Sequence, residues 1–213
     1  RGDGNSFISF DNQHKKQEWG KYMYKKSVQG WLKHLDFMIL DGIQKLHSPL
    51  LDTLFVCITR LGDKGFVWCL MALVFLLIPE KRKTGFICVA ALLLTEITGN
   101  HILKPLFARV RPCDVNQAVQ LLIANPGGYS FPSGHTSASF AAASGLCFRE
   151  KRKVAVPALL LAALIGFSRM YLYVHYPTDI AGGILLGTLM GYVCVQAADR
   201  IKYRKNSINI ERK

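Results

Sequence analysis

Long apolar runs separated by short charged loops occupy the chain from residue 65 onwards. A helix needs about 20 mostly apolar residues to cross the hydrocarbon core of a bilayer, and several runs approach this length. The five runs cover residues 65–79, 85–103, 133–148, 154–173 and 180–198. The first run is short, so we expect its helix to extend towards the N terminus. Soluble cores seldom contain five such segments in 213 residues, and the pattern therefore predicts a polytopic membrane protein.

Lysine and arginine accumulate in the loops at alternate ends of these runs. Basic segments cover residues 80–83, 149–153 and 200–213, after the first, third and fifth runs. Short loops rich in Lys and Arg stay on the cytoplasmic side of a membrane. With five spans all three basic segments lie on one face, which we assign to the cytoplasm. The other ends of the spans are then extracytoplasmic.

The region before residue 65 carries too many charges for a clean span. Within residues 34–64, the apolar Leu35, Ile39 and Ile43 recur at helical spacing, which favours an amphipathic helix lying in the membrane interface. A sixth, tilted crossing is the alternative, and it would place the basic residues 14–33 inside the cell. The predicted fold is all-α: a polytopic membrane bundle of five to six transmembrane helices with an interfacial N-terminal helix.

The chain divides into three predicted parts: an N-terminal tail and interfacial region (1–60), a transmembrane domain (61–200) and a basic cytoplasmic tail (201–213). Its composition is 50% hydrophobic, with 27 Lys and Arg against 14 Asp and Glu, a formal net charge of +13. Such basicity indicates nucleic acid or anionic lipid as a partner, and the apolar runs favour lipid. The six cysteines show no CxxC and no metal-ligand spacing, so we expect neither a zinc site nor a disulfide framework.

Three polar clusters fall at the predicted extracytoplasmic ends of spans two to five. The clusters are Lys104, Arg109 and Arg111; Pro132, Ser133, Gly134 and His135; and Ser168, Arg169, His175 and Asp179. Their cations stand on the face that the positive-inside rule depletes. Snorkelling side chains that anchor helix ends to lipid phosphates are the alternative explanation. Against it, Lys104 and Arg111 are seven residues apart, which places them on one face of a helix. Arg109 lies off that face, and we consider it a lipid-headgroup contact.

The second cluster has the features of an anion site at a helix N terminus. Pro132 suits the first turn of a helix and leaves the following backbone N–H groups free. These groups and the positive end of the helix dipole attract anions, and Gly134 lets an oxygen come close. A turn that only caps the helix is the alternative.

The third cluster places a histidine and a carboxylate four residues apart. If residues 176–178 form a turn, Asp179 reaches one ring nitrogen of His175. A carboxylate there fixes the tautomer and stabilises the cation that forms when the other nitrogen attacks. A buried His–Asp pair that only ties two helices together is the alternative.

Cations, a helix N terminus and two histidines together describe a pocket for a phosphoryl group. One histidine attacks phosphorus and the other protonates the departing oxygen. Asp114 and Asp179 are too few to form a carboxylate cluster for a divalent cation, so we predict metal-independent phosphoryl transfer with no cofactor.

The same residues resemble the three signatures of the type 2 phosphatidic acid phosphatase family. The matching segments are Lys104 to Pro112 (Lys-x6-Arg-Pro), Pro132 to His135 (Pro-Ser-Gly-His) and Ser168 to Asp179 (Ser-Arg-x5-His-x3-Asp). Every signature position is filled in order, directly over residues 104–179, whereas residues 1–60 are not covered. The family's fold is a helical bundle that gathers these motifs at one end.

The resemblance implies a role for each matching residue. His175 is then the nucleophile that forms a phosphohistidine, Asp179 orients it, and His135 is the general acid and later the base for water. The implied phosphate-binding residues are Lys104, Arg111, Ser133, Gly134, Ser168 and Arg169. Arg109 is not a signature position.

The expected substrate is a lipid phosphate or diphosphate at the extracytoplasmic face of the cell membrane. Undecaprenyl diphosphate is our first expectation, and phosphatidylglycerophosphate or phosphatidic acid is the alternative; residues 113–131 are the cap expected to choose. A lipid phosphotransferase, a non-catalytic lipid-phosphate carrier and a vanadium haloperoxidase stay open as other classes. Nucleic acid is not expected as a partner.

Overall fold

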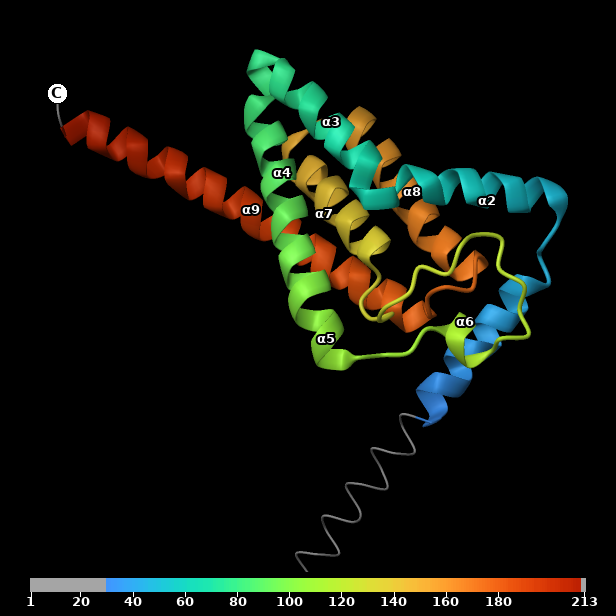
Figure 1. The fold of residues 1–213 in the computed structure, drawn as a ribbon. Helices are drawn as coiled ribbons and strands as arrows, with labels where there is room; N and C mark the ends of the chain where they lie inside the picture. The colour runs from blue at the N-terminus through green and yellow to red at the C-terminus, as the bar shows by residue number, and fades with distance from the viewer. Residues whose placement is uncertain (1–29, 212–213) are drawn as a thin grey trace, which may run out of the picture. The chain divides into compact units, whose positions relative to one another are not determined.

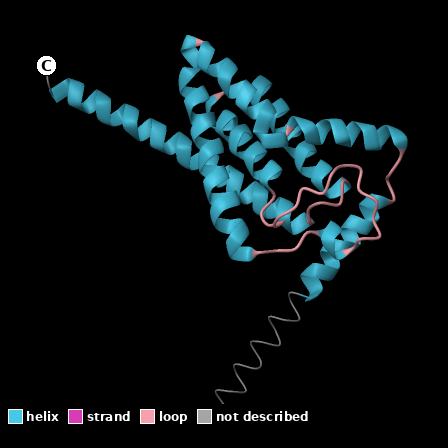
Figure 2. Ribbon diagram, in the orientation of Figure 1, coloured by secondary structure: helices cyan, strands magenta, loops and turns pink. Residues whose placement is uncertain are grey.

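The structure, a computed structural model, describes residues 30–211, with side chains up to residue 201. Its described part is built from helices and loops with no strand (Figures 1 and 2). After a helix over residues 30–44, the elements are α2 (Pro49–Leu61), η1 (Asp63–Gly65), α3 (Phe66–Leu77), η2 (Pro79–Lys81), α4 (Arg82–Glu96), the π-helical η3 (Ile97–Leu103), α5 (Lys104–Phe107), α6 (Pro112–Val115), α7 (Gly134–Arg149), α8 (Arg152–Tyr171) and α9 (Pro177–Glu211). The all-α prediction is confirmed for the described residues.

The chain divides into two compact units, the first ending at Ile39 and the second running from Leu40 to Lys213. Every predicted site residue belongs to the second unit. The interfacial position of residues 1–60 stays a prediction, and the basic residues 14–29 lie outside the described residues.

Three helical stretches are long and apolar enough to cross a membrane, judged by length and composition: Pro79–Val115, Arg152–Tyr171 and Pro177–Ile201. They correspond to the second, fourth and fifth apolar runs. The first and third runs form α3 and α7, which have 12 and 16 residues. The number of crossings, five or six, stays a prediction.

The expected N-terminal extension of the first run is wrong. Lys64 and Gly65 adopt left-handed backbone conformations, with φ values of 52° and 69°, so α2 and α3 are separate helices joined by a tight turn. A left-handed pair of residues cannot continue a right-handed helix. This turn, at residues 62–65, lies against the site described below.

Helix α7 packs against α9, α8 and α4, and most of its residues are buried (Figure 1). Gly183, Gly187 and Gly191 form a stripe on α9 facing α7, and a Cβ at Gly183 would lie 3.0 Å from the Ser133 carbonyl oxygen. At Gly187 a Cβ would collide with the Ser137 carbonyl oxygen. Small residues at this spacing let two helix backbones approach closely. The stripe therefore holds the N terminus of α7 beside the start of α9.

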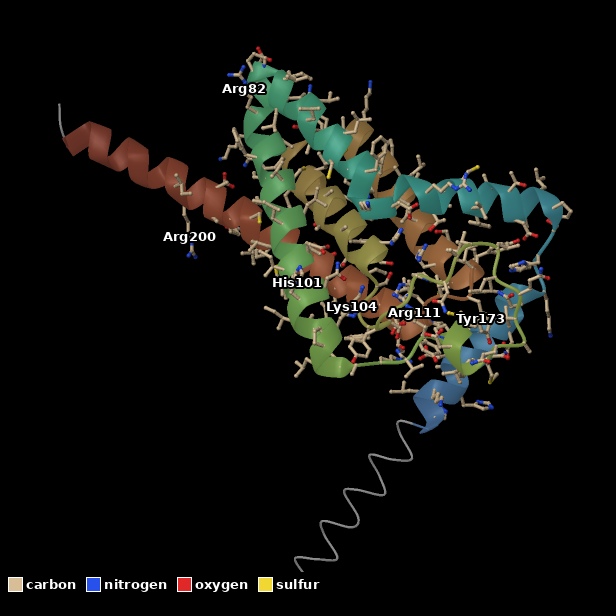
Figure 3. All side chains as sticks on the ribbon, viewed as in Figure 1. Arg82, His101, Lys104, Arg111, Tyr173 and Arg200 are labelled. Atoms are coloured by element: carbon tan, nitrogen blue, oxygen red, sulfur yellow. The ribbon has the colours of Figure 1, made fainter. Side chains whose placement is uncertain are left out.

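The opposite end of the bundle carries the loops predicted to be cytoplasmic. Lys83 and Arg149 both donate to Asp199, at 2.6 and 2.9 Å, and Lys81 pairs with Glu150. Figure 3 shows Arg82 and Lys104 at opposite ends of the helical stretch that begins with α4. The two groups of charged residues thus lie at different ends of the fold.

Candidate active site

One cavity of about 540 Å³ is lined by residues from all three polar clusters. Among its lining residues are six that the sequence singled out: Lys104, Arg111, Gly134, His135, Arg169 and His175. These residues come from segments separated by as many as 71 positions, so only the fold brings them together. Lys104 and Arg111 are labelled in Figure 3.

His175 lies in the turn between α8 and α9, and Asp179 in the first turn of α9. Nδ1 of His175 is 3.4 Å from Oδ2 of Asp179, which also accepts from the backbone N–H of Tyr176 at 2.9 Å. Nε2 of His175 is 3.1 Å from Nη1 of Arg111. A carboxylate at Nδ1 and a guanidinium donor at Nε2 together assign the proton to Nδ1 and the lone pair to Nε2. The predicted turn therefore brings the carboxylate to one ring nitrogen and turns the other to the cavity.

The His175 ring is buried, outside the ends of the flanking helices. Burial, followed by the charges of Arg111 and Arg169, lowers the pKa of His175 to about 3, although the hydrogen bond to Asp179 acts in the opposite direction. Desolvation disfavours the charged imidazolium, and nearby cations add to that effect. The imidazole is therefore neutral at ordinary pH, which is the state a nucleophile requires.

The backbone that places Arg111 at the cavity differs from the predicted helix. Helix α5 ends at Phe107 because Ala108 takes a left-handed conformation with φ of 44°, and Arg111 follows in extended backbone with ψ of 153°. The inference that Lys104 and Arg111 share one helix face is therefore wrong, although both line the cavity. The buried guanidinium donates to the carbonyls of Gly127 at 2.8 Å and Tyr129 at 3.2 Å, so the predicted cap segment holds it in place.

Arg109 lies beside Asp179, and its predicted contact with a lipid headgroup stays a prediction. Its Nη1 donates to Oδ1 of Asp179 and to Oγ1 of Thr178, both at 2.6 Å. The guanidinium also stands over the Tyr176 ring, 3.9 Å from its centroid. Asp179 is thus held by a cation on one oxygen and by the histidine and a backbone N–H on the other.

The remaining cations flank the start of α7. Nη1 of Arg169 donates to Oγ1 of Thr59 at 2.5 Å, and its buried Nε has no partner among the described residues. A Cβ at Gly134 would lie 3.8 Å from Nζ of Lys104 and 3.4 Å from Oδ1 of Asn100. The absence of a side chain at Gly134 leaves space beside these polar groups, as the anion-site interpretation requires.

The two serines of the clusters do not line the cavity. Ser133 is the N-cap of α7 and accepts from Oγ1 of Thr136 at 3.0 Å, while Ser168 donates to the carbonyl of Ile165 at 2.7 Å. Pro132 precedes the N-cap, so its predicted place in the first helical turn is wrong. The hydroxyls satisfy helix backbones, and their contact with phosphate stays a prediction.

The sequence analysis missed Asp63. Its Oδ1 lies 2.9 Å from Nε2 of His135, from the turn between α2 and α3. Neither the spacing nor any motif connects these two residues, and the segment before residue 65 has no match to the family signatures. Glu96 and Lys64 also line the cavity without having been predicted.

Within the part of the chain that the structure describes, no three His, Cys, Asp or Glu side chains gather as a metal-binding group. Metal-independent chemistry stays a prediction.

Comparisons with known proteins agree with the geometry. The sequence profile described as "PAP2 superfamily" matches residues 84–203. The chain is 28% identical over 170 residues to an undecaprenyl-diphosphatase of Bacillus subtilis, covering 78% of this chain and 84% of that one. It is 32% identical over 169 residues to a lipid A 4'-phosphatase of Porphyromonas gingivalis, covering 73% and 68%.

Solved structures show the same fold. The crystal structure of LpxE from Aquifex aeolicus matches with a TM-score of 0.67 and 32% identity, over 76% of this chain and 95% of that one. A transmembrane PAP2-type phosphatidylglycerolphosphate phosphatase from Bacillus subtilis matches with a TM-score of 0.68 and 24% identity, over 79% and 87%. Since the profile covers more than half of the 213 residues and its signatures meet in one cavity, the chain belongs to the PAP2 superfamily and is a membrane lipid phosphatase.

Proposed function

We propose that this protein is a multi-pass phosphatase that hydrolyses undecaprenyl diphosphate at the extracytoplasmic face of the membrane through a phosphohistidine on His175. One observation carries the proposal: a single cavity holds two histidines among four cationic side chains, Lys64, Lys104, Arg111 and Arg169. A lipid diphosphate carries more negative charge than a monoester, and several cations around one site favour it. The relatives named undecaprenyl-diphosphatase, from Bacillus subtilis and Sulfolobus acidocaldarius, add support.

The first chemical step in this proposal is attack by Nε2 of His175 on the terminal phosphorus. The P–N bond forms while the bond from phosphorus to the bridging oxygen breaks, and His135 gives its proton to that oxygen. Asp179 stabilises the positive charge that develops on the His175 ring. Arg111, close to Nε2, offsets charge on the transferring oxygens.

The second step is hydrolysis of the phosphohistidine. His135, now neutral, takes a proton from water, whose oxygen attacks phosphorus and breaks the P–N bond. The products are inorganic phosphate and the lipid monophosphate, and both histidines return to their starting states. In this scheme water is the acceptor, which distinguishes a phosphatase from a phosphotransferase.

The proposed orientation follows from the two charged ends of the fold. The loops with Lys81, Lys83 and Arg149 lie at the end away from the cavity. Because short basic loops remain cytoplasmic, the cavity is proposed to face the opposite side.

A second candidate substrate is phosphatidylglycerophosphate, and one observation favours it. The Glu96 carboxylate lines the cavity and accepts from Nδ2 of Asn100 at 2.6 Å. A carboxylate repels the second phosphate of a diphosphate and accepts hydrogen bonds from a glycerol hydroxyl. A Bacillus subtilis relative at 29% identity is named phosphatidylglycerophosphatase B.

A substrate panel tests the proposal. The purified protein in detergent is given undecaprenyl diphosphate, phosphatidylglycerophosphate or phosphatidic acid, with EDTA or with magnesium, and released phosphate is measured. We expect the diphosphate lipid to give a kcat/KM at least ~10-fold above the others, a difference of about 1.4 kcal/mol in transition-state stabilisation, with EDTA causing no loss. His175→Ala is the control for contaminating phosphatase. Comparable or better turnover of phosphatidic acid would overturn the substrate, and loss of activity in EDTA would overturn the metal-independent mechanism.

A further inference from the structure

The turn between α2 and α3 contacts His135 at two adjacent atoms of its ring. Oδ1 of Asp63 is 2.9 Å from Nε2, and a Cβ built on Gly62 would lie 2.8 Å from Cδ2. The first contact is a charge-assisted hydrogen bond, and the second shows that a residue larger than glycine would displace the ring. Two consecutive residues of one turn therefore fix the same edge of the imidazole.

The same end of α2 also supports the cation next to His135. Thr59, one helical turn before Asp63 and buried, accepts from Nη1 of Arg169 at 2.5 Å. The segment from Thr59 to Asp63 lies outside the family profile, which begins at residue 84, and outside the three signatures. This segment therefore contacts two cavity residues although it belongs to none of the three signatures.

We propose that Asp63 is the positioning residue of the general acid, holding Nε2–H of His135 so that Nδ1 is the nitrogen that exchanges protons with substrate and water. The inference rests on the proposed function, because it assigns a partner to the acid of that mechanism. None of the residues that the structure describes hydrogen-bonds to Nδ1 of His135. Asp63 does not touch the reacting atoms; it acts through the ring.

The chemistry of the pair follows from the two states of the ring. In the imidazolium form, Nε2–H donates to Asp63 and Nδ1–H is given to the leaving oxygen as the P–O bond breaks. In the neutral ring, Nε2–H still donates to Asp63, so the lone pair must be on Nδ1, which then takes a proton from water. Burial and the charges of Arg169 and Lys104 disfavour the imidazolium, and the Asp63 carboxylate opposes them. The carboxylate thus favours the state needed for the first step. Without Asp63 the ring can turn, and the neutral form can adopt the other tautomer.

The test compares two leaving groups, because only a poor leaving group needs the acid. The lipid in this test is the monoester phosphatidylglycerophosphate, whose glycerol oxygen is a poor leaving group unless it is protonated, whereas p-nitrophenyl phosphate releases a stable phenolate. The variants are Asp63→Asn, which keeps an acceptor but loses the charge, and Asp63→Ala, which loses both. We expect kcat/KM for the lipid to fall ~10-fold in Asp63→Asn and ~100-fold in Asp63→Ala, against less than ~3-fold for p-nitrophenyl phosphate in either.

The pH profile gives a second readout that a structural role would not move. With the lipid substrate, the alkaline limb of kcat/KM should shift to lower pH by about one unit in Asp63→Asn, because the imidazolium loses its anionic partner. Glu80→Gln, an acid-to-amide change at an exposed residue in the turn before α4, is the matched control and should leave activity and profile unchanged. Gly62→Ala, which pushes the ring while keeping Asp63, should show the same dependence on leaving group.

The outcomes distinguish a failure of the role proposed for Asp63 from a failure of the proposed function. Equal losses on both substrates, or no loss on the lipid, in the Asp63 variants would overturn the positioning role. If His135→Ala also keeps full lipid turnover, the proposed function itself fails. Retained thermal stability in Asp63→Asn, measured by the melting temperature, identifies the loss as chemical.

Discussion

The two histidines of the cavity each meet a carboxylate, but the two sides of the site are built differently. His175 and Asp179 are four residues apart in one motif, and only 3% and 0% of their side chains are exposed. His135 and Asp63 are 72 residues apart, and 21% and 59% of their side chains are exposed. The carboxylate meets Nδ1 in His175 and Nε2 in His135.

The difference matches the work proposed for each ring. A buried imidazole with a low pKa stays neutral and presents one lone pair, which suits a nucleophile. A more exposed imidazole can exchange protons with a leaving group and with water, which suits an acid and base. Burial on one side and access on the other therefore fit the two roles proposed for the two histidines.

Replacing each histidine by alanine should cause the largest losses of activity and show most clearly how the two histidines differ. His175→Ala should lose ~10⁴-fold or more in turnover of every substrate, since it removes the atom that bonds to phosphorus. His135→Ala should lose ~10²–10⁴-fold on a lipid monoester such as phosphatidylglycerophosphate but still transfer the phosphoryl group from p-nitrophenyl phosphate to His175. We expect a burst of about one equivalent of p-nitrophenol, and the phosphorylated protein should be detected by mass spectrometry after an alkaline quench.

The same experiment can contradict the assignment of roles. A burst in His175→Ala would show that another group is the nucleophile. Binding of vanadate to His175→Ala, followed by its effect on the melting temperature, checks that the pocket survives the substitution.

Removing Arg111 tests the contribution of its charge on the His175 side of the site. Arg111 contacts Nε2 of His175 and is fixed by backbone carbonyls, so its charge is held beside the proposed nucleophile. Arg111→Ala should lower kcat by ~10²–10³-fold, as expected for a missing preorganised donor. The matched control is Arg82→Ala, whose guanidinium bonds to the Leu76 carbonyl at the other end of the bundle and whose loss should change kcat less than ~2-fold. Equal effects of the two substitutions would contradict a specific role for Arg111.

The His175 side was predictable from sequence because its geometry is local. A spacing of four residues across a turn fixes the distance between His175 and Asp179 with little help from the rest of the fold. The approach of Lys104 and Arg111 was also predicted, but for an incorrect reason, since the helix that was assumed to connect them ends at Phe107. Both residues line the cavity, but the backbone between them is not the helix that the spacing predicted.

The His135 side could not be predicted in the same way. Its partner Asp63 comes from a turn that forms because Lys64 and Gly65 leave the helical region, and the apolar pattern contains no sign of this break. The pairing of Arg109 with Asp179 likewise depends on how the loop after α5 folds back. Long-range contacts of charged side chains follow from packing, which sequence periodicity does not encode.

The pH dependence of kcat/KM is the smallest effect that we expect, and it depends on both histidines. From sequence alone, the pair of histidines predicts activity that rises and then falls between pH 5 and 9, since one ring must be neutral and the other protonated. Because the pKa of His175 is lowered to about 3, its neutral fraction is essentially complete at every pH above roughly 4, and protonation of this ring removes activity only below that range. As the pH is lowered from 7 to 5, kcat/KM for the lipid should therefore not fall, and the loss of activity at higher pH should come from His135 alone. The measurement is kcat/KM at constant ionic strength, with chemistry shown to be rate-limiting by comparison of the lipid with p-nitrophenyl phosphate. A tenfold loss between pH 7 and 5 would mean that His175 takes up a proton near its ordinary pKa, and hence that the nucleophile is far more hydrated than its burial between α8 and α9 implies.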